Sequence, residues 1–93
     1  MSKGYYIYLD QRDVGKGDML FLGWVNEQDN MVVYNKTPKG TGKNVPVFSI
    51  RDSRMVYEHK EMADKTVEMI SNMYPEITEL LHVELYEEVT FDD

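Results

Sequence analysis

The first apolar segment of the chain, residues 5–9, alternates as a half-buried β-strand does. Its odd positions hold Tyr5, Ile7 and Leu9, and both even positions hold tyrosine. The segment that follows, residues 10–18, is polar and contains two glycines, which is typical of a loop. We therefore expect a strand over residues 5–9 that ends in a loop.

Two apolar runs separated by a short polar segment come next. Residues 19–25 are almost continuously apolar, and residues 31–34 (Met-Val-Val-Tyr) follow the polar stretch Asn-Glu-Gln-Asp-Asn. A run of this length is typical of a buried strand rather than a helix. The pattern predicts a β-hairpin of these two runs, joined by a five-residue loop over residues 26–30.

A lysine-bearing loop and a fourth strand are expected after the hairpin. Residues 35–44 contain three lysines, two glycines and one proline, so we expect a loop. Residues 45–50 have the composition of a strand. Because proline has no N–H to donate to a neighbouring strand, Pro46 predicts that this strand lies at an edge of the sheet.

The next segment has the three- and four-residue spacing of apolar side chains that is typical of an α-helix, up to Tyr74. Its start is open between two alternatives. Asp52 and Ser53 can cap a helix or turn a hairpin, and residues 54–59 can form a short strand with the helix beginning near Lys60. The helix is expected to end at Tyr74, because a proline follows and disfavours helical geometry in the residue before it.

The final segment alternates again after a short helical turn, and residues 81–91 are expected to form a strand. The resulting order is β-β-β-β-α-β. It predicts an α+β fold in which a small, largely antiparallel sheet has one main helix packed on one face. Residues 1–93 are expected to form a single domain.

Composition narrows the class of protein. The 93 residues are 42% hydrophobic and 29% charged, as in small globular domains. The chain has no cysteine, which excludes disulfides and thiolate zinc sites. No apolar run approaches the length of a membrane span, and residues 1–9 lack the pattern of a signal peptide. We therefore expect a cytoplasmic protein that has no membrane contact.

Charge is unevenly divided along the chain, whose net charge is −7. Residues 1–54 hold eight Lys or Arg and six Asp or Glu, a net +2, whereas residues 55–93 hold two and eleven, a net −9. A negative surface steers association toward a basic partner surface. We therefore expect a non-enzymatic interaction protein that binds and modulates or inhibits a protein partner. The expected acidic binding residues are Glu76, Glu79, Glu84, Glu87, Glu88, Asp92 and Asp93.

Two further features refine this expectation. Tyr6 and Tyr8 lie on the opposite face of the first strand from Ile7 and Leu9, so they are expected interface aromatics. Small acidic proteins without catalytic motifs occur among phage accessory proteins. This association favours a phage-type inhibitor that mimics nucleic acid and occupies a basic, nucleic-acid-binding surface. An edge strand and an aromatic face also permit a homodimer.

The alternative function is a small β-rich nucleic-acid-binding module. Its basic residues would be those in or beside the lysine loop at residues 36–43: Lys36, Lys39, Lys43, Arg51 and Arg54. Trp24, Tyr34 and Phe48 would supply a platform on which bases stack. The negative charge of the second half opposes this alternative, because it repels phosphate.

Motifs that would support catalysis or metal binding are incomplete. Residues 40–43 (Gly-Thr-Gly-Lys) contain part of a phosphate-binding loop, but its first glycine and the helix that should follow are missing. His59 and His82 lack further ligands at a suitable spacing, so each is expected to be half-buried in a hydrogen bond. Adjacent carboxylates such as Glu87 and Glu88 point to opposite faces of a strand. We expect no enzymatic activity, no cofactor and no metal.

Overall fold

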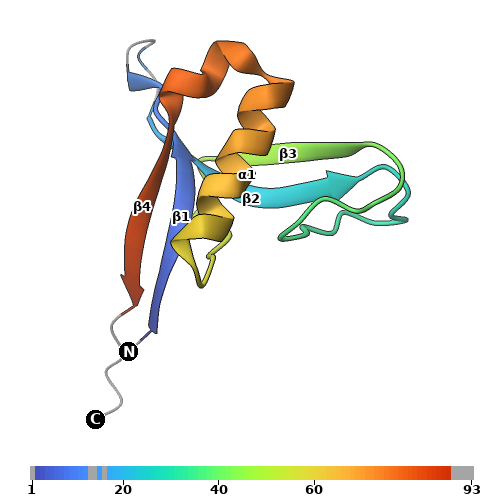
Figure 1. Ribbon diagram of the computed structural model, residues 1–93, viewed down its shortest axis with the longest axis horizontal. Helices are drawn as coiled ribbons and strands as arrows, with labels where there is room; N and C mark the ends of the chain where they lie inside the picture. Colours follow the sequence, from blue (N-terminus) through green and yellow to red (C-terminus); the bar gives the residue numbers. More distant parts are fainter. Residues whose placement is uncertain (1, 13–14, 16, 89–93) are drawn as a thin grey trace.

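The architecture is a four-stranded sheet with one main helix. The computed structural model describes residues 2–12, 15 and 17–88. Its elements, shown in Figure 1, are β1 (Ser2–Leu9), β2 (Met19–Asn26), β3 (Asn44–Ser49), α1 (Lys60–Met73), the 3₁₀ helix η2 (Pro75–Leu80) and β4 (Leu81–Glu88). The strand order is β3-β2-β1-β4, and all neighbours are antiparallel. The predicted α+β fold with an antiparallel sheet and one main helix is confirmed.

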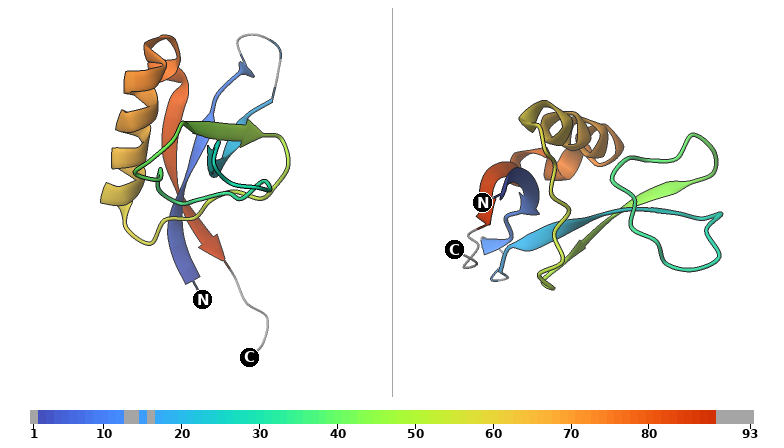
Figure 2. Two further views of the ribbon diagram at one scale, coloured as in Figure 1. Left: turned by 90° about the vertical axis from the view of Figure 1, so that its right-hand side faces the viewer. Right: turned by 90° about the horizontal axis from the view of Figure 1, so that it is seen from below.

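The hydrophobic core lies between α1 and one face of the sheet. Figure 2 shows α1 on one side of the sheet. Ala63, Thr66 and Ile70 are the buried positions of α1, and their spacing of three and four residues places them on one side of the helix. The strands contribute Ile7, Leu9, Phe21, Trp24 and Leu81 to the same core. Burial of each large apolar side chain favours folding by about 1.5–3 kcal/mol, so this seam holds the helix on the sheet.

The central strand β1 pairs with its two neighbouring strands over very different lengths. It pairs with β4 along its whole length of eight residues. It pairs with β2 at only two positions, Tyr8 with Leu20 and Leu9 with Met19. The two strands then separate, which leaves a row of backbone groups of β1 without a partner from β2.

The segment before α1 fills this gap. Tyr57 exchanges two backbone hydrogen bonds with Tyr5, with N···O distances of 2.8 and 2.7 Å, and the N–H of Met55 donates to the carbonyl of Phe21 at 2.8 Å. The chain therefore runs between β1 and β2 and satisfies backbone groups of both strands. Of the two alternatives for residues 54–59, an extended segment before a helix that begins at Lys60 is the one observed, with a single bridge at Tyr57.

Of the two ends of α1, only the C-terminal one has a single predicted position, and this prediction is confirmed. Asp52 and Ser53 do not cap the helix, because they lie in a bend seven residues or more before its first turn. His59 is the N-cap residue and makes no side-chain capping hydrogen bond. The expected helix end is confirmed, since Tyr74 is the C-cap and its N–H donates to the carbonyl of Ile70.

The predicted hairpin between residues 19–25 and 31–34 is wrong. Residues 31–34 are outside any strand, and Met31 and Val32 are 73% and 70% exposed. β2 pairs with β3 instead, where Phe48 packs on Phe21 with ring centroids 5.5 Å apart. Pairing with β3 adds an aromatic side chain to the core, which residues 31–34 do not. The element order therefore has three strands before the helix, not four.

β3 is one of the two edge strands of the sheet, the other being β4, and Pro46 lies on it as predicted. Pro46 is opposite Trp24, and Trp24 exchanges both of its backbone hydrogen bonds with Asn35 on its other side, at 2.8 and 2.7 Å. The backbone nitrogen of Pro46 therefore faces the free edge rather than β2. Its missing N–H costs no hydrogen bond within the sheet and weakens the edge as a template for another strand.

The last strand is confirmed as far as the structure describes it. β4 begins at Leu81, as predicted, and continues to Glu88. The rest of the predicted strand, residues 89–91, lies outside the described residues. The helical turn expected before it is η2.

Candidate functional site

The face of β1 and β4 opposite α1 carries a row of aromatic side chains. Residues directly opposite each other in antiparallel strands share a face, and Tyr6 is opposite Glu84 while Tyr8 is opposite His82. Tyr86 lies two positions beyond Glu84, on the same face. We refer to Tyr6, Tyr8, His82, Glu84 and Tyr86 as the tyrosine face.

The rings of the tyrosine face pack against one another and remain partly open. Tyr8 stacks on His82 with ring centroids 5.1 Å apart, and Tyr6 meets Tyr86 edge to face at 6.0 Å. The three tyrosines are half-buried, and His82 and Glu84 are exposed. The alternation predicted for β1 is confirmed, since Ile7 is fully buried under α1. Within the described part of the chain, α1 covers only the opposite face of these two strands.

One cation already lies on this face. The guanidinium carbon of Arg54 is 4.5 Å from the centroid of the Tyr6 ring and 4.8 Å from that of Tyr86. Asp52 also accepts a hydrogen bond from Arg54 Nε at 2.9 Å and forms an ion pair with this guanidinium group. A guanidinium over a tyrosine ring contributes about 0.5–1 kcal/mol at an exposed site. The tyrosine face thus has a geometry that holds an arginine side chain.

Carboxylates surround the other end of the same face. Burial raises the pKa of the Tyr8 phenol, and the negative charges of Glu84, Asp18 and Asp10 raise it further. Arg12 donates to both carboxylate oxygens of Asp10, at 3.0 and 2.7 Å, and these hydrogen bonds hold the pKa of Asp10 well below its usual range. Asp10 is therefore ionised and paired with Arg12, and Glu84 and Asp18 add further negative charge at the end of the face near Tyr8.

The acidic residues predicted as a binding surface do not share one face. Glu76 and Glu79 lie on η2, whereas Glu84 belongs to the tyrosine face. Glu87 lies on the other side of β4 and pairs with Lys3 at 3.6 Å. The backbone of Glu88 is opposite that of Ser2, and Asp92 and Asp93 lie outside the described residues. The segment 76–88 therefore distributes its charge over three parts of the molecule.

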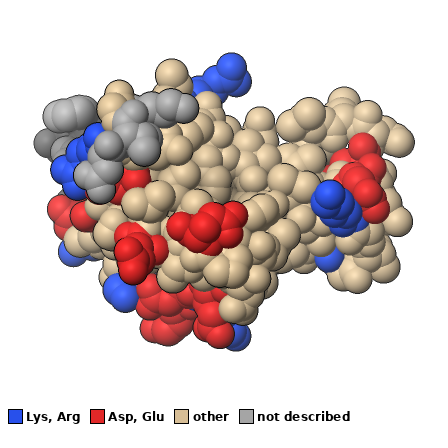
Figure 3. Space-filling view, turned by 90° about the horizontal axis from the view of Figure 1, so that it is seen from above, with Lys and Arg blue, Asp and Glu red and all other residues tan. Residues whose placement is uncertain are grey.

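A second group of carboxylates lies along α1. Glu61, Asp64 and Glu68 are exposed on the helix, and Lys60 pairs with Asp64 at 3.0 Å. Figure 3 shows several groups of Asp and Glu side chains on one part of the main body, with Lys and Arg side chains near them. These helix residues extend the negative potential beyond the strands, although sequence reasoning did not place them in the binding set.

The basic residues of the alternative function are dispersed, and several have partners. Lys39 forms an ion pair with Asp29, and Lys36 lies over the ring of Tyr57 at 5.7 Å. Arg54 lies on the tyrosine face, and Arg51 is exposed beyond the end of β3. Lys39 is hydrogen-bonded to Asn44, next to Lys43, whereas Arg51 lies beyond the other end of β3. The five residues therefore do not form one surface.

The aromatic platform expected for that function is also wrong in two of its three members. Trp24 is 1% exposed, and Phe48 is partly buried against the core. The ring of Trp24 has no open face on which a base could stack, and that of Phe48 is only partly accessible. Tyr34 alone is exposed.

A pocket that sequence reasoning missed lies between α1 and the loop before β3. It has a volume of about 440 Å³ and is lined by Trp24, Pro38, Lys43, Asn44, Met69, Asn72 and Met73. A smaller hollow of about 210 Å³ follows along the same side of β3, beside Pro46, Phe48 and Tyr74. Only the four-residue spacing of Met69 and Met73 on the helix was visible in the sequence.

The loop wall of the pocket is held by a buried asparagine. Asn26 is almost fully buried, and its side-chain amide donates to the carbonyl of Thr41 at 2.7 Å and to Asn44 Oδ1 at 3.0 Å. Its own Oδ1 accepts the N–H of Gln28 at 2.9 Å. These bonds fix the segment 39–44, which contains the glycine–lysine motif, against the end of β2. A strand and not a helix follows that motif, so it has no helix N-terminus for a phosphate.

Trp24 forms part of the pocket wall, and its indole N–H is an unpaired hydrogen-bond donor among the described residues. Its indole N–H is buried and has no hydrogen-bond acceptor among the residues that the structure describes. A buried donor without an acceptor costs about 1–3 kcal/mol. The rest of the side chain is well packed in the core, where its ring meets Phe21 at 6.0 Å.

The histidines differ from expectation. His59 and His82 are both exposed rather than half-buried in hydrogen bonds. His59 precedes α1 and His82 stacks on Tyr8. In residues 2–12, 15 and 17–88, no three His, Asp or Glu side chains are grouped to hold a metal ion, and no helix is long and apolar enough to cross a membrane.

Comparison with protein families, with curated proteins and with solved structures found no match to this chain. The candidate sites are therefore the tyrosine face and the pocket beside Trp24, both defined by geometry and charge.

Proposed function

We propose that this protein binds a basic surface of a partner protein through the tyrosine face and modulates that partner without catalysis. The observation that carries the proposal is the combination of partly open tyrosine rings and carboxylates on a sheet face that α1 leaves uncovered. Tyrosine supplies large contact area at low entropic cost, which makes it a frequent anchor of interfaces.

The charge of the face supports a basic partner. Glu84 is exposed among the rings, and Asp10 and Asp18 lie near Tyr8. The segment 55–93 adds a net charge of −9, which attracts a positive surface over a longer range. This field increases the association rate and is weakened by salt.

Arg54 supports the specific contact that the face offers. Its guanidinium lies against Tyr6 and Tyr86 with Asp52 beside it. Tyr8, His82 and Glu84 present a similar combination of rings and carboxylate at the other end of the face. We propose that an arginine or lysine side chain of the partner binds there. An inhibitor that covers the nucleic-acid-binding surface of its partner is the specific form of this proposal.

Two charge reversals of equal size test the proposal. Glu84→Lys changes the tyrosine face, and Glu68→Lys makes the same change of net charge on the exposed side of α1. Wild type and both variants are used as baits in nuclease-treated native lysate, and each captured protein is then purified and its affinity measured. We expect Glu84→Lys to weaken binding on the order of tenfold, because like charges would meet at the interface. Glu68→Lys should have a much smaller effect.

Three results would contradict the proposal. Equal losses in both variants would show a dependence on total charge rather than on this face. Unchanged binding by Glu84→Lys would exclude the face. Loss of all captured protein on nuclease treatment would favour the nucleic-acid alternative.

A further inference from the structure

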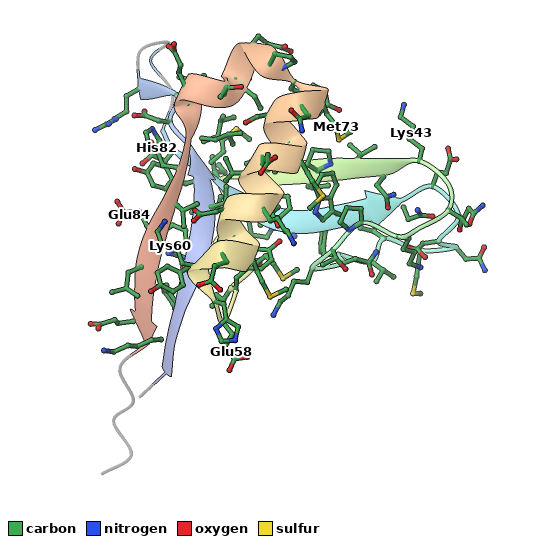
Figure 4. All side chains as sticks on the ribbon, viewed as in Figure 1. Lys43, Glu58, Lys60, Met73, His82 and Glu84 are labelled. Carbon is green, nitrogen blue, oxygen red and sulfur yellow. The ribbon has the colours of Figure 1, made fainter. Side chains whose placement is uncertain are left out.

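The pocket between α1 and the segment 38–44 lies on a different part of the molecule from the tyrosine face. Figure 4 shows Met73 and Lys43 on one side, at the end of α1 and the start of β3, and His82 and Glu84 on the other. Its volume of about 440 Å³ is within the range of pockets that hold small molecules. A helix or a long peptide would not fit in such a volume.

The lining of the pocket is apolar with a polar mouth. Trp24, Pro38, Met69 and Met73 provide the apolar walls. Methionine side chains adapt to ligands of different shape, because they are unbranched and flexible. Met73 is 45% exposed although it is apolar, so a ligand here would remove apolar surface from water.

The charge of the lining is unlike that of the whole protein. Lys43 is the one charged residue among those that line this pocket, in a chain of net charge −7. Glu27 accepts a hydrogen bond from the backbone N–H of Lys43 at 2.9 Å, but no carboxylate of the described residues lies within ion-pair distance of the Lys43 ammonium group. The side-chain oxygen of Asn44 already accepts bonds from Asn26 and Lys39. The mouth therefore offers an unused positive charge beside apolar walls.

We propose that this pocket binds a small apolar carboxylic acid. The aromatic or aliphatic part of the ligand lies on Pro38, Met69 and Met73, and its carboxylate pairs with Lys43. This site does not depend on the tyrosine face, so a ligand and a protein partner can bind independently.

A matched pair of ligands tests the proposal in the full chain. 4-Phenylbutyrate and its neutral amide, 4-phenylbutyramide, have the same apolar part and differ in charge. Trp24 is the single tryptophan, so one indole N–H signal in a ¹H–¹⁵N NMR spectrum reports on the pocket. We expect both ligands to shift this signal and the amide signals of residues 69–73. The acid should bind about two- to fivefold more tightly than the amide, as an exposed ion pair allows.

Variants then test whether Lys43 causes the preference for the acid over the amide. Lys43→Gln should remove the difference between acid and amide without weakening the amide. Lys65→Gln makes the same change of charge on the exposed side of α1 and should preserve the difference. Met73→Glu alters an exposed lining residue, so the fold is retained, and it should make the acid bind more weakly than the amide.

Several results would overturn the proposal. It is wrong if neither ligand shifts the Trp24 signal at millimolar concentration, or if acid and amide bind wild type equally. It is also wrong if Lys43→Gln and Lys65→Gln have the same effect. If a short peptide with a free C-terminal carboxylate binds here and the small acids do not, the pocket takes the end of a partner chain instead.

Discussion

Gly4 lies where the segment before α1 comes closest to β1. A Cβ atom at this position would lie 2.2 Å from Cγ1 of Val56 and 3.1 Å from the carbonyl oxygen of Tyr57. Any residue with a side chain would therefore push this segment away from β1, although Tyr57 must bond with Tyr5 beside it. The glycine is required here for close approach of two backbones.

Replacement of this glycine should be costly. We expect Gly4→Ala to lower the free energy of unfolding by about 1–3 kcal/mol, because the added methyl group overpacks the contact with Val56. The control is Gly40→Ala, where no atom lies within 4 Å of the added Cβ. Urea denaturation followed by Trp24 fluorescence measures both. Equal midpoints for the two variants would contradict the role given to Gly4.

At the scale of the element, β3 is one of the two edge strands of the sheet, and Pro46 lies on its unpaired side. The nitrogen of Pro46 faces this free edge, as its pairing with Trp24 requires. An edge strand with a full set of donors and acceptors is a template for pairing with another molecule.

Restoration of the missing donor should promote self-association. We expect Pro46→Val to form dimers or larger species as protein concentration rises, because residue 46 then donates an N–H at the edge. Sedimentation velocity over a range of concentrations measures this, and Thr37→Val, in the exposed loop, controls for the added apolar surface. If Pro46→Val remains as monomeric as wild type, the edge is protected in another way.

Elements whose evidence is local were predictable from the sequence. The alternation of residues 5–9, the apolar run 19–25 and the proline after Tyr74 each determine structure within a few residues, and the structure agrees with them. Residues 31–34 have an equally good strand pattern and form none. Strand pairing is decided by which segment completes the core, and Phe48 does so from β3. Such a choice between distant segments is invisible to a local pattern.

The candidate sites also combine features that local sequence predicts with features that depend on contacts between distant segments. Alternation predicted that Tyr6 and Tyr8 share a face away from Ile7, but the addition of Arg54 to that face depends on the path of residues 54–57 between two strands. The acidic set was chosen from a region of sequence, and strand alternation places Glu84 and Glu87 on opposite sides of β4. The pocket requires a loop held by Asn26 across a separation of fifteen residues, which no spacing rule reveals.

At the scale of the whole molecule, we expect the folded state to become less stable at acidic pH. Hydrogen bonds from Arg12 lower the pKa of Asp10, and those from Lys39 lower the pKa of Asp29. A carboxyl group whose pKa is lower in the folded state stabilises that state above its unfolded pKa, near 3.9. This stabilisation is lost as the pH falls through the folded pKa. We therefore expect the urea midpoint to fall as the pH decreases below about 4.

The variant Asp29→Asn measures how much of this loss of stability at acidic pH comes from the carboxyl group of Asp29. It should be less stable than wild type at pH 7 and should lose less stability between pH 5 and pH 2, because one of the two shifted carboxyl groups is absent. Urea denaturation at each pH gives both quantities. Parallel pH profiles for wild type and Asp29→Asn would show that the pair with Lys39 contributes nothing to acid sensitivity.

The unequal pairing of β1 has a consequence for how the protein is made. β1 leaves the ribosome before the other elements described here. Its full-length neighbour β4 is the last of these elements, and the segment that contains Tyr57 pairs with β1 on the other side. Contacts so distant in sequence close slowly. During synthesis the tyrosine-rich strand therefore remains without its main neighbour until β4 has emerged. In that interval a factor that shields nascent chains from aggregation would matter most for this protein.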